Sequence, residues 1–229
     1  MIQKTRFQQF FSGVRDELPI LVGVIPFGMI YGILALGAGL RPADAQVMSA
    51  VIFAGSSQFM TVQLIKAQTP ALVIILTGFV INLRHALYSA SLAPYLQHLN
   101  AGWKTLLAYL LTDEAYAVAV THYARDGQTR YSHWYFLGAG LALWGSWQVS
   151  TAVGIFLGAQ VPESWGLDFT LPLTFIALVV PALKDRAGIV TAVVASLAAL
   201  AFLALPLKLG LIAAALTAIM TGLWVEKLQ

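Results

Sequence analysis

The chain consists largely of long apolar stretches that contain very few charges, and this restricts it to a membrane environment. Of its 229 residues, 59% are hydrophobic and only 10% are charged, whereas soluble domains carry about 25% charged residues. Too little polar surface remains to cover a globule in water. The stretches are rich in Leu, Ala and Gly and lack the alternating pattern of a membrane β-barrel. The sequence therefore predicts an all-α, polytopic integral membrane protein.

The apolar stretches predict about eight transmembrane helices, because a spanning helix needs about 20 apolar residues. We expect them to form one transmembrane domain over residues 1–229. The expected spans are 18–39, 44–65, 70–95, 105–122, 134–158, 168–183, 187–205 and 208–225. The third has polar residues at its centre, so it forms either one tilted span or two shorter pieces. We expect some of the helices to break at mid-membrane.

The basic residues predict the orientation of these spans, because Lys and Arg accumulate on the cytoplasmic side of a membrane protein. With the N-terminus inside, the cytoplasmic side would hold Lys4, Arg6, Arg15, Lys66, Arg125, Arg130, Lys184, Arg186 and Lys227. The outer side would hold only Arg41, Lys104 and Lys208. This bias predicts that both termini are cytoplasmic.

Several function classes are disfavoured by the sequence. There is no cysteine, so disulfides and thiolate metal sites are excluded. The histidines lack metal-ligand spacing, and neither a phosphate-binding Gly-Lys-Ser/Thr loop nor a nucleophile elbow occurs. The net charge of +3 is modest and its residues are scattered at the ends of segments, which argues against nucleic acid. We therefore expect a non-enzyme without metal or cofactor, in a lipid bilayer.

A polar sequence, Gly55-Ser56-Ser57-Gln58, lies in the middle of the second expected span. Gly and Ser weaken a helix there, and in lipid such a break survives only where it lines a cavity or is buried in protein. The freed N–H groups of a half-helix can bind an anionic group such as a carboxylate. The alternative is a patch of small residues that lets a neighbouring helix approach.

Arg84 is the strongest single signal, because a charged group in hydrocarbon is costly and is usually functional. Its guanidinium can hold a carboxylate with two hydrogen bonds. The alternatives are an ion pair with an acidic residue of another span, or snorkelling to the interface. The neighbouring His85 is either a proton relay or a hydrogen-bonded packing residue. Tyr88 lies on the same helical face as Arg84 and is either a ligand or a packing aromatic.

Two adjacent acids, Asp113 and Glu114, lie in the fourth expected span. Neighbouring side chains on a helix point about 100° apart, so they rarely share one partner. One acid would face Arg84, and the other would face a water-filled path, carry a proton or bind a substrate ammonium. The alternative is structural, with Asp113 capping a helix break and Glu114 paired with Arg84.

Three motifs at this order and spacing resemble the AzlC family: Phe53-Ala-Gly-Ser-Ser-Gln-Phe59, Asn82-Leu-Arg-His-Ala-Leu-Tyr88 and Leu111-Thr-Asp-Glu-Ala-Tyr116. The resemblance covers nearly the whole chain. These proteins are described as branched-chain amino acid permeases, the large subunit of a two-component exporter. The family often has Asp where this chain has Asn82, which removes one acid from the expected site.

The resemblance implies export of valine, leucine, isoleucine or methionine across the bacterial inner membrane. It also implies a small AzlD-type membrane subunit as partner, and the heteromeric unit would be able to form a homo-oligomer. A secondary transporter, coupled to protons through Asp113, Glu114 or His85, is the leading hypothesis. Two other classes are an ion or small-solute channel, and a membrane scaffold whose charges form buried ion pairs.

In the transporter hypothesis, the substrate carboxylate meets Arg84 or the 55–57 backbone, and its ammonium meets Asp113 or Glu114. The other substrate-binding residues are Gln58, Asn82 and Tyr88, with Phe53, Phe59 and Tyr116 around the apolar side chain.

Overall fold

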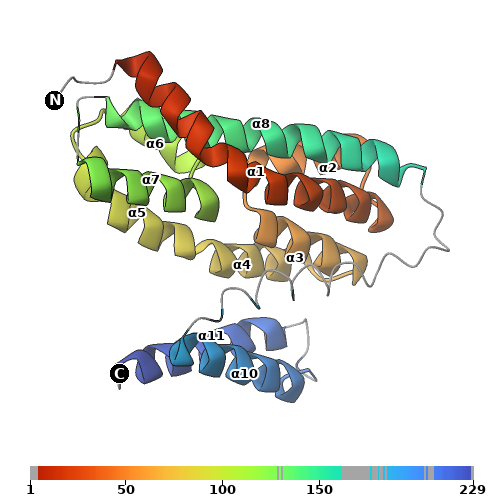
Figure 1. Cartoon of the computed structure of the whole chain (residues 1–229). Coiled ribbons are helices and arrows are strands. Elements are labelled where there is room, and N and C mark those ends of the chain that lie inside the picture. Colours follow the sequence, from red (N-terminus) through yellow and green to blue (C-terminus); the bar gives the residue numbers. More distant parts are fainter. Residues whose placement is uncertain are drawn as a thin grey trace. The chain divides into compact units, whose positions relative to one another are not determined.

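The computed structural model describes residues 5–127, 129, 131–160, 176, 180, 183, 185–203, 205 and 209–227. The named elements within this part of the chain are all α-helices, which confirms the all-α part of the predicted fold class (Figure 1). They are α1 (Arg6–Gly37), α2 (Pro42–Val51), α3 (Gly55–Lys66), α4 (Ala71–Asn82), α5 (Arg84–Leu96), α6 (Ala101–Tyr109), α7 (Asp113–Asp126), α8 (Ser132–Gly158), α10 (Arg186–Ala201) and α11 (Leu209–Glu226).

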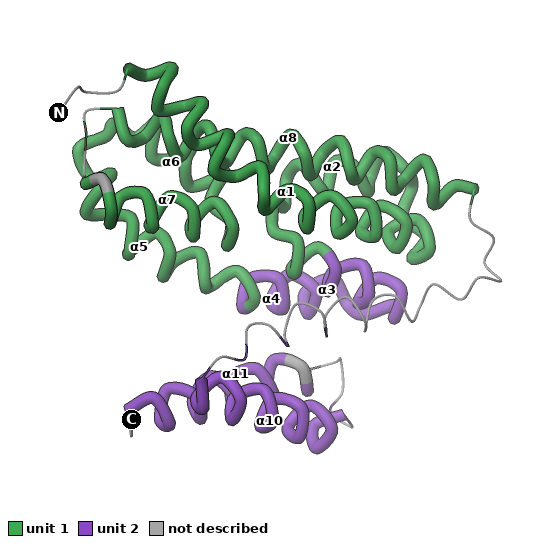
Figure 2. The backbone as a smooth tube through the Cα atoms, in the orientation of Figure 1, with its two compact units in different colours: residues 1–58, 81–162 green, residues 59–80, 163–229 purple. Residues whose placement is uncertain are grey.

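The chain forms two compact units, which Figure 2 distinguishes by colour. The first unit contains residues 1–58 and 81–162, and the second contains residues 59–80 and 163–229. Within the second unit, α10 packs against α11. Of the residues singled out from the sequence as site candidates, all except Phe59 belong to the first unit.

The first unit is built around α1 and α8, which run parallel to each other in close contact. The facing pairs advance together along both helices: Gly13 with Tyr135, Gly28 with Ser150, and Gly32 with Thr151. A methyl group on Gly32 would lie only 2.5 Å from the Thr151 carbonyl oxygen. Small residues therefore permit this close approach of two backbones, as in many membrane helix pairs.

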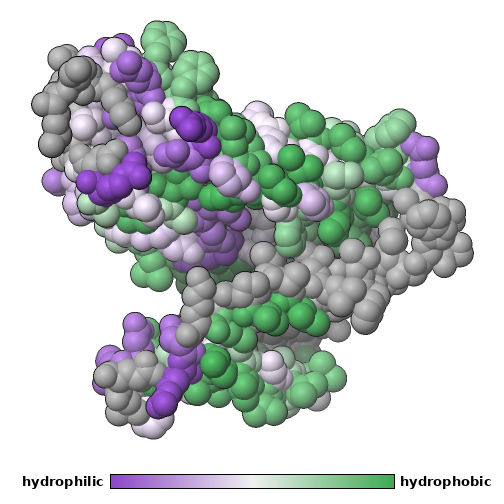
Figure 3. Space-filling model, in the orientation of Figure 1, coloured by the Kyte–Doolittle hydropathy of each residue, from purple (hydrophilic) through white to green (hydrophobic). Residues whose placement is uncertain are grey.

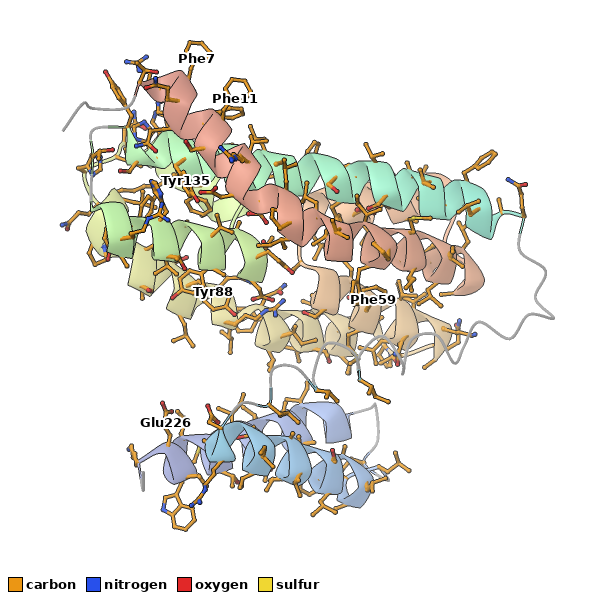
Figure 4. The ribbon with its side chains drawn as sticks, in the orientation of Figure 1. Phe7, Phe11, Phe59, Tyr88, Tyr135 and Glu226 are labelled. Carbon is orange, nitrogen blue, oxygen red and sulfur yellow. The ribbon has the colours of Figure 1, made fainter. Side chains whose placement is uncertain are left out.

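Three stretches of the described chain are long and apolar enough to cross a membrane: Arg6–Gly37, Ala71–Leu96 and Ser132–Gly158. Large apolar side chains on them face outward, including Phe7 and Phe11 on α1, which project away from the helices around them (Figure 4). On the face of the first unit drawn in Figure 3, hydrophilic residues gather at the end where α1 begins. Outward apolar side chains suit contact with lipid rather than water.

The first span begins earlier than expected, at Arg6 rather than at residue 18. The cause is a capping box, in which Gln8 donates its backbone N–H to the Thr5 side chain while the Gln8 side chain accepts from the Thr5 backbone. The sequence 15–17, which contains three charges in a row, therefore lies inside the helix.

The segment expected as a single span over 105–122 is instead a helical hairpin, so that prediction is wrong. Trp103 at the start of α6 contacts Trp134 (ring centroids 5.3 Å apart), and Tyr123 near the end of α7 donates to the Ser132 carbonyl. Both contacts lie at the start of α8. The turn between α6 and α7 instead reaches Gly140, one third of the way along α8. The chain therefore enters through α6 and returns through α7 to the same end.

This hairpin also corrects the expected position of Lys104. Together with Trp103, Lys104 lies at the end of the first unit where α8 begins, the end that also holds Arg6 and Arg125. Arg6 there stacks over the rings of Tyr131 and Trp134 (5.2 and 6.0 Å). The sequence had predicted Lys104 on the opposite side.

The other expected spans have mixed outcomes. The stretches 134–158, 187–205 and 208–225 correspond to α8, α10 and α11. The stretch 44–65 is divided into α2 and α3 at residues 52–54, as its Gly-Ser-Ser-Gln sequence predicted. The stretch 70–95 is one interrupted span, because Leu83 between α4 and α5 keeps helical φ and ψ of −55° and −27°. Most of 168–183 lies outside the described residues.

Candidate functional site

Two helices begin in the interior of the first unit, at places where the chain has stopped being helical. Residues 52–54 separate α2 from α3, and residues 110–112 separate α6 from α7. Thr112 caps α7 by accepting the N–H of Ala115 at 3.3 Å. The first N–H groups of a helix lack partners within the helix, so each start presents donors and the positive end of a dipole. In a membrane protein, such interior helix starts are suited to binding charged or polar groups.

The α7 start lies beside the Leu83 interruption, because α5 and α7 run parallel in contact. Tyr88 stacks on Tyr116 with ring centroids 4.5 Å apart, and Tyr95 contacts Tyr123 at 5.1 Å. Tyr116 also donates to Ser91 at 2.9 Å. Figure 4 shows Tyr88 on the side of α5 that faces α7. This ladder of contacts brings the first residues of α5 and α7 together.

Arg84, the first residue of α5, contacts residues at the starts of both α7 and α3. Its Nη1 forms an ion pair with the Oδ2 of Asp113 on α7, and its Nη2 donates to Ser56 on α3 at 2.7 Å. The Arg84 and Asp113 side chains are 30% and 38% exposed, so the pair is accessible rather than sealed. Of the two predicted partners of Arg84, the structure selects Asp113 rather than Glu114.

Further polar groups lie around this pair. Asn82 donates to the Ser57 hydroxyl at 3.3 Å, and Gln58 is fully buried near Tyr31. A side chain at Gly55 would begin 3.2 Å from the Trp147 ring, so this position lets the indole approach the start of α3. The predicted residues of the Gly-Ser-Ser-Gln sequence, Asn82 and Arg84 are therefore brought together.

Tyr88 and His85 lie one turn or less from Arg84. The Tyr88 hydroxyl faces Asp113, consistent with either role predicted for this residue. The Nδ1 of His85 lies 3.1 Å from the Asn82 carbonyl, and its ring meets the Tyr88 ring edge to face. His85 thus has the hydrogen-bonded packing position that was the alternative to a proton relay.

The apolar pocket expected around Phe53, Phe59 and Tyr116 is only partly assembled within the first unit. Tyr116 reaches the site through its stacking on Tyr88. Phe53 instead packs against Tyr109 at 6.3 Å. Phe59 is buried but belongs to the second unit.

One acidic residue at this level of the bundle was missed from the sequence. Glu17 on α1 is 0% exposed, and neither of its carboxylate oxygens has a hydrogen-bond partner. It lies within electrostatic range of Glu114. A signal for it was present, because the Thr5-x-x-Gln8 capping pattern places the helix start at Arg6 and therefore puts Glu17 three turns into the helix.

The Arg84–Asp113 pair has the chemistry to accept a zwitterion. Arg84 leaves its Nε without a partner, and Asp113 leaves its Oδ1 without one. A guanidinium binds carboxylates, and a carboxylate binds ammonium groups. Insertion of a zwitterion between them would replace one ion pair with two and leave the net charge unchanged. Among the described residues, no group of three or more side chains is placed to hold a metal ion.

Comparison with known proteins places this site within a family. Residues 19–161 match the AzlC protein family, and this stretch contains every predicted site residue. The chain belongs to the AzlC family. Glu17 lies just outside the matched stretch, two residues before its start.

Several relatives cover most of the chain. The inner membrane protein YgaZ of Escherichia coli (strain K12) is 28% identical over 225 residues, which are 94% of this chain and 91% of that protein. An uncharacterized membrane protein of Archaeoglobus fulgidus is 31% identical over 94% of both chains. The branched-chain amino acid transport protein AzlC of Bacillus subtilis is 28% identical over 74% of this chain and 66% of that protein. No solved structure matches the chain.

Proposed function

We propose that this AzlC family member is a secondary transporter that exports branched-chain or other hydrophobic amino acids across the cytoplasmic membrane. The observation that carries the proposal is the Arg84–Asp113 pair, held among apolar helices at interior helix starts. Charged side chains are costly in a membrane, so those that are present usually serve the passage of a polar solute or an ion. The name of the Bacillus subtilis relative supports a branched-chain amino acid as the solute.

In this proposal the substrate carboxylate binds Arg84 and the N–H groups that begin α3. The Ser56 hydroxyl, which already contacts Arg84, would orient the guanidinium. The substrate ammonium binds Asp113, whose Oδ1 has no hydrogen-bond partner. Both contacts are strengthened by the low dielectric of the bundle interior. Tyr88 and Tyr116 line the side toward which an apolar side chain would extend.

The basic residues at one end of the first unit support an orientation of α1 and α8 across the membrane. Arg6, Lys104 and Arg125 lie near the starts of α1 and α8, while Arg41 at the start of α2 pairs with Asp44. Because basic residues accumulate in the cytoplasm, we propose that α1 and α8 both begin there. A cytoplasmic C-terminus remains a prediction. So does a small AzlD-type membrane subunit as partner.

Counterflow in proteoliposomes tests the proposed function. Vesicles that contain the purified protein, with a small AzlD-type subunit encoded in the same genome where one is present, are loaded with unlabelled leucine. They are then diluted into trace labelled leucine. A transporter accumulates label transiently and with saturation, and it prefers the L-enantiomer. A channel gives uptake that neither saturates nor discriminates, and a scaffold gives none; either result contradicts the proposal.

A variant pair links the transport to the site. We expect Arg84→Gln to abolish counterflow, since it removes the carboxylate partner. Arg41→Gln is the matched control, because Arg41 forms a similar ion pair on the exposed surface at the start of α2. Equal loss in both variants would show that the effect is not specific to the site.

A further inference from the structure

Glu17 is buried at the same level as the site but takes no part in the contacts described there. It follows Gly13 by one helical turn, and Gly13 faces Tyr135 on α8. One turn further along α8, Gly140 meets Leu110 in the break before α7. Glu17 is therefore level with the interior start of α7, deep inside the first unit. It is fully buried and both carboxylate oxygens lack a partner.

In the part of the chain that the structure describes, the Glu17 carboxylate has no hydrogen-bond partner and forms neither of the two ion pairs, and Arg125 of α7 lies in electrostatic range of the neighbouring Tyr135. From α7 it is faced by Glu114, the second acid of the Asp113–Glu114 doublet. From α8 it is faced by Tyr135, whose hydroxyl donates to the adjacent Asp16 at 2.8 Å and whose ring stacks on His122 at 3.7 Å. The charged pair of the α2 start, Arg41–Asp44, is bound to itself and exposed. Arg84 is engaged by Asp113 and Ser56.

We propose that Glu17 and Glu114 together form a proton-binding site that couples this protein to the proton gradient. The inference rests on the proposed transport function and names the coupling ion and its residues. An ionised carboxylate buried without a cation or hydrogen-bond donor is strongly unfavourable. Among the described residues Glu17 lacks both, whereas Glu114 has hydrogen bonds from Thr112 and from its own backbone. A proton held by this pair bonds to one carboxylate oxygen and removes one of the two negative charges.

The burial of Glu17 favours a proton over a larger ligand. A substrate ammonium needs an opening of its own size, and Glu17 is 0% exposed. A metal ion needs more ligands than two acids, and no group of three or more candidate side chains occurs in the described part of the chain. A proton needs neither an opening nor further ligands.

Coupling follows from the electrostatic link between the two sites. Glu114 interacts with both Asp113 and Arg84. When the Glu17–Glu114 pair takes up a proton, the negative charge beside Asp113 falls by one. The site then holds a substrate ammonium less strongly, and release of the proton restores that attraction, so that proton and substrate oppose each other's binding as exchange of an inward proton for an outward amino acid requires. This reciprocity between two ligands is the basis of coupled transport.

The test uses proteoliposomes that contain the full chain, with the leucine flux measured in the presence and in the absence of an imposed pH gradient. We expect the gradient to accelerate flux in the unmodified protein and the ratio of the two rates to fall to one in Glu17→Gln. Glu226→Gln is the matched control, because Glu226 is exposed on α11 (Figure 4). A gradient response in Glu17→Gln equal to that of the control overturns the proposal.

A second measurement does not depend on transport. Infrared difference spectra of the purified protein, recorded between acidic and alkaline pH, report buried carboxylic acids by their C=O stretch. We expect one such band to be lost in Glu17→Gln and kept in Glu226→Gln. An unchanged band pattern in Glu17→Gln overturns the proton site even if leucine is transported. Conversely, a band lost in a protein that moves no amino acid supports the proton site and contradicts the proposed function alone.

Discussion

The two Arg–Asp ion pairs among the described residues of the first unit share chemistry but differ in how they are built. Arg41 and Asp44 lie three residues apart at the start of α2, with side chains 81% and 46% exposed, and their nitrogen–oxygen distance is 2.6 Å. Arg84 and Asp113 come from different helices, are 30% and 38% exposed, and lie beside Ser56 at the start of α3. The first pair is local and solvated, whereas the second depends on the tertiary fold.

The difference shows which pair can act on a solute. Exposed pairs contribute little because water and salt screen them. The pair between α5 and α7 lies between helix starts whose dipoles and free donors add to its field. It also keeps one unused atom on each partner. We therefore propose the substrate contacts for Arg84 and Asp113, and only a local role at the start of α2 for Arg41 and Asp44.

The largest predicted contrast is between Arg84→Gln and Arg41→Gln. A hydrogen bond to a charged group contributes about 1.5–3 kcal/mol, so loss of the Arg84 contact should weaken leucine binding roughly 10- to 100-fold. Arg41→Gln should leave binding unchanged. The affinities are measured by equilibrium binding of labelled leucine to the purified proteins in detergent, which does not require transport. A comparable affinity loss in Arg41→Gln would remove the distinction between the two pairs.

A charge swap separates a substrate contact from a purely structural pair. In the double variant Arg84→Asp with Asp113→Arg, attraction between the partners is kept, so we expect thermal stability in detergent to exceed that of either single variant. Transport should stay lost, because an aspartate at position 84 would repel the substrate carboxylate. The swap is followed by melting temperature and by counterflow. Restored transport would indicate that the pair is structural only.

A smaller effect is expected for Ser56→Ala. The change removes one acceptor from the Arg84 guanidinium, whose Nη2 donates to Ser56 at 2.7 Å. This charge-assisted bond orients the guanidinium without contacting the substrate, so its loss should weaken leucine binding by only about 1 kcal/mol, and the half-saturating leucine concentration should rise about fivefold. Ser196→Ala is the control, because Ser196 is exposed on α10 and bonds only the Ala192 carbonyl of its own helix. Equal shifts in both variants would contradict a role for Ser56.

The smallest effect concerns the pH dependence of the exposed pair. The Arg41 guanidinium lowers the pKa of Asp44 below its ordinary value. A carboxyl with a depressed folded-state pKa stabilises the fold above its unfolded-state pKa, about 3.9 for Asp, and loses that contribution as the pH falls through the folded-state pKa. Asp44→Asn should therefore change the melting temperature only slightly and flatten its decline in acid. A large change near neutral pH would contradict the view that this pair is solvated.

The sequence predicted the chemistry of the site better than its topology. Arg84, Asp113 and the break just before Gly55–Gln58 were found because charges and helix breakers are conspicuous in apolar stretches. The α6–α7 hairpin was missed because hydropathy measures length and polarity, and two short helices that return on themselves resemble one span. Glu17 was missed because three consecutive charges suggest a loop. Its burial depends on packing between α1, α7 and α8, which hydropathy does not report.

The central claim is that Arg84 binds the carboxylate of an amino acid. Competition against labelled leucine tests it most directly, with leucinamide, which lacks the carboxylate, as the competitor and unlabelled leucine as the reference. In the unmodified protein we predict that leucine competes far more strongly than leucinamide. In Arg84→Gln that preference should disappear while Arg41→Gln keeps it. A preference that persists undiminished in Arg84→Gln would contradict the assignment.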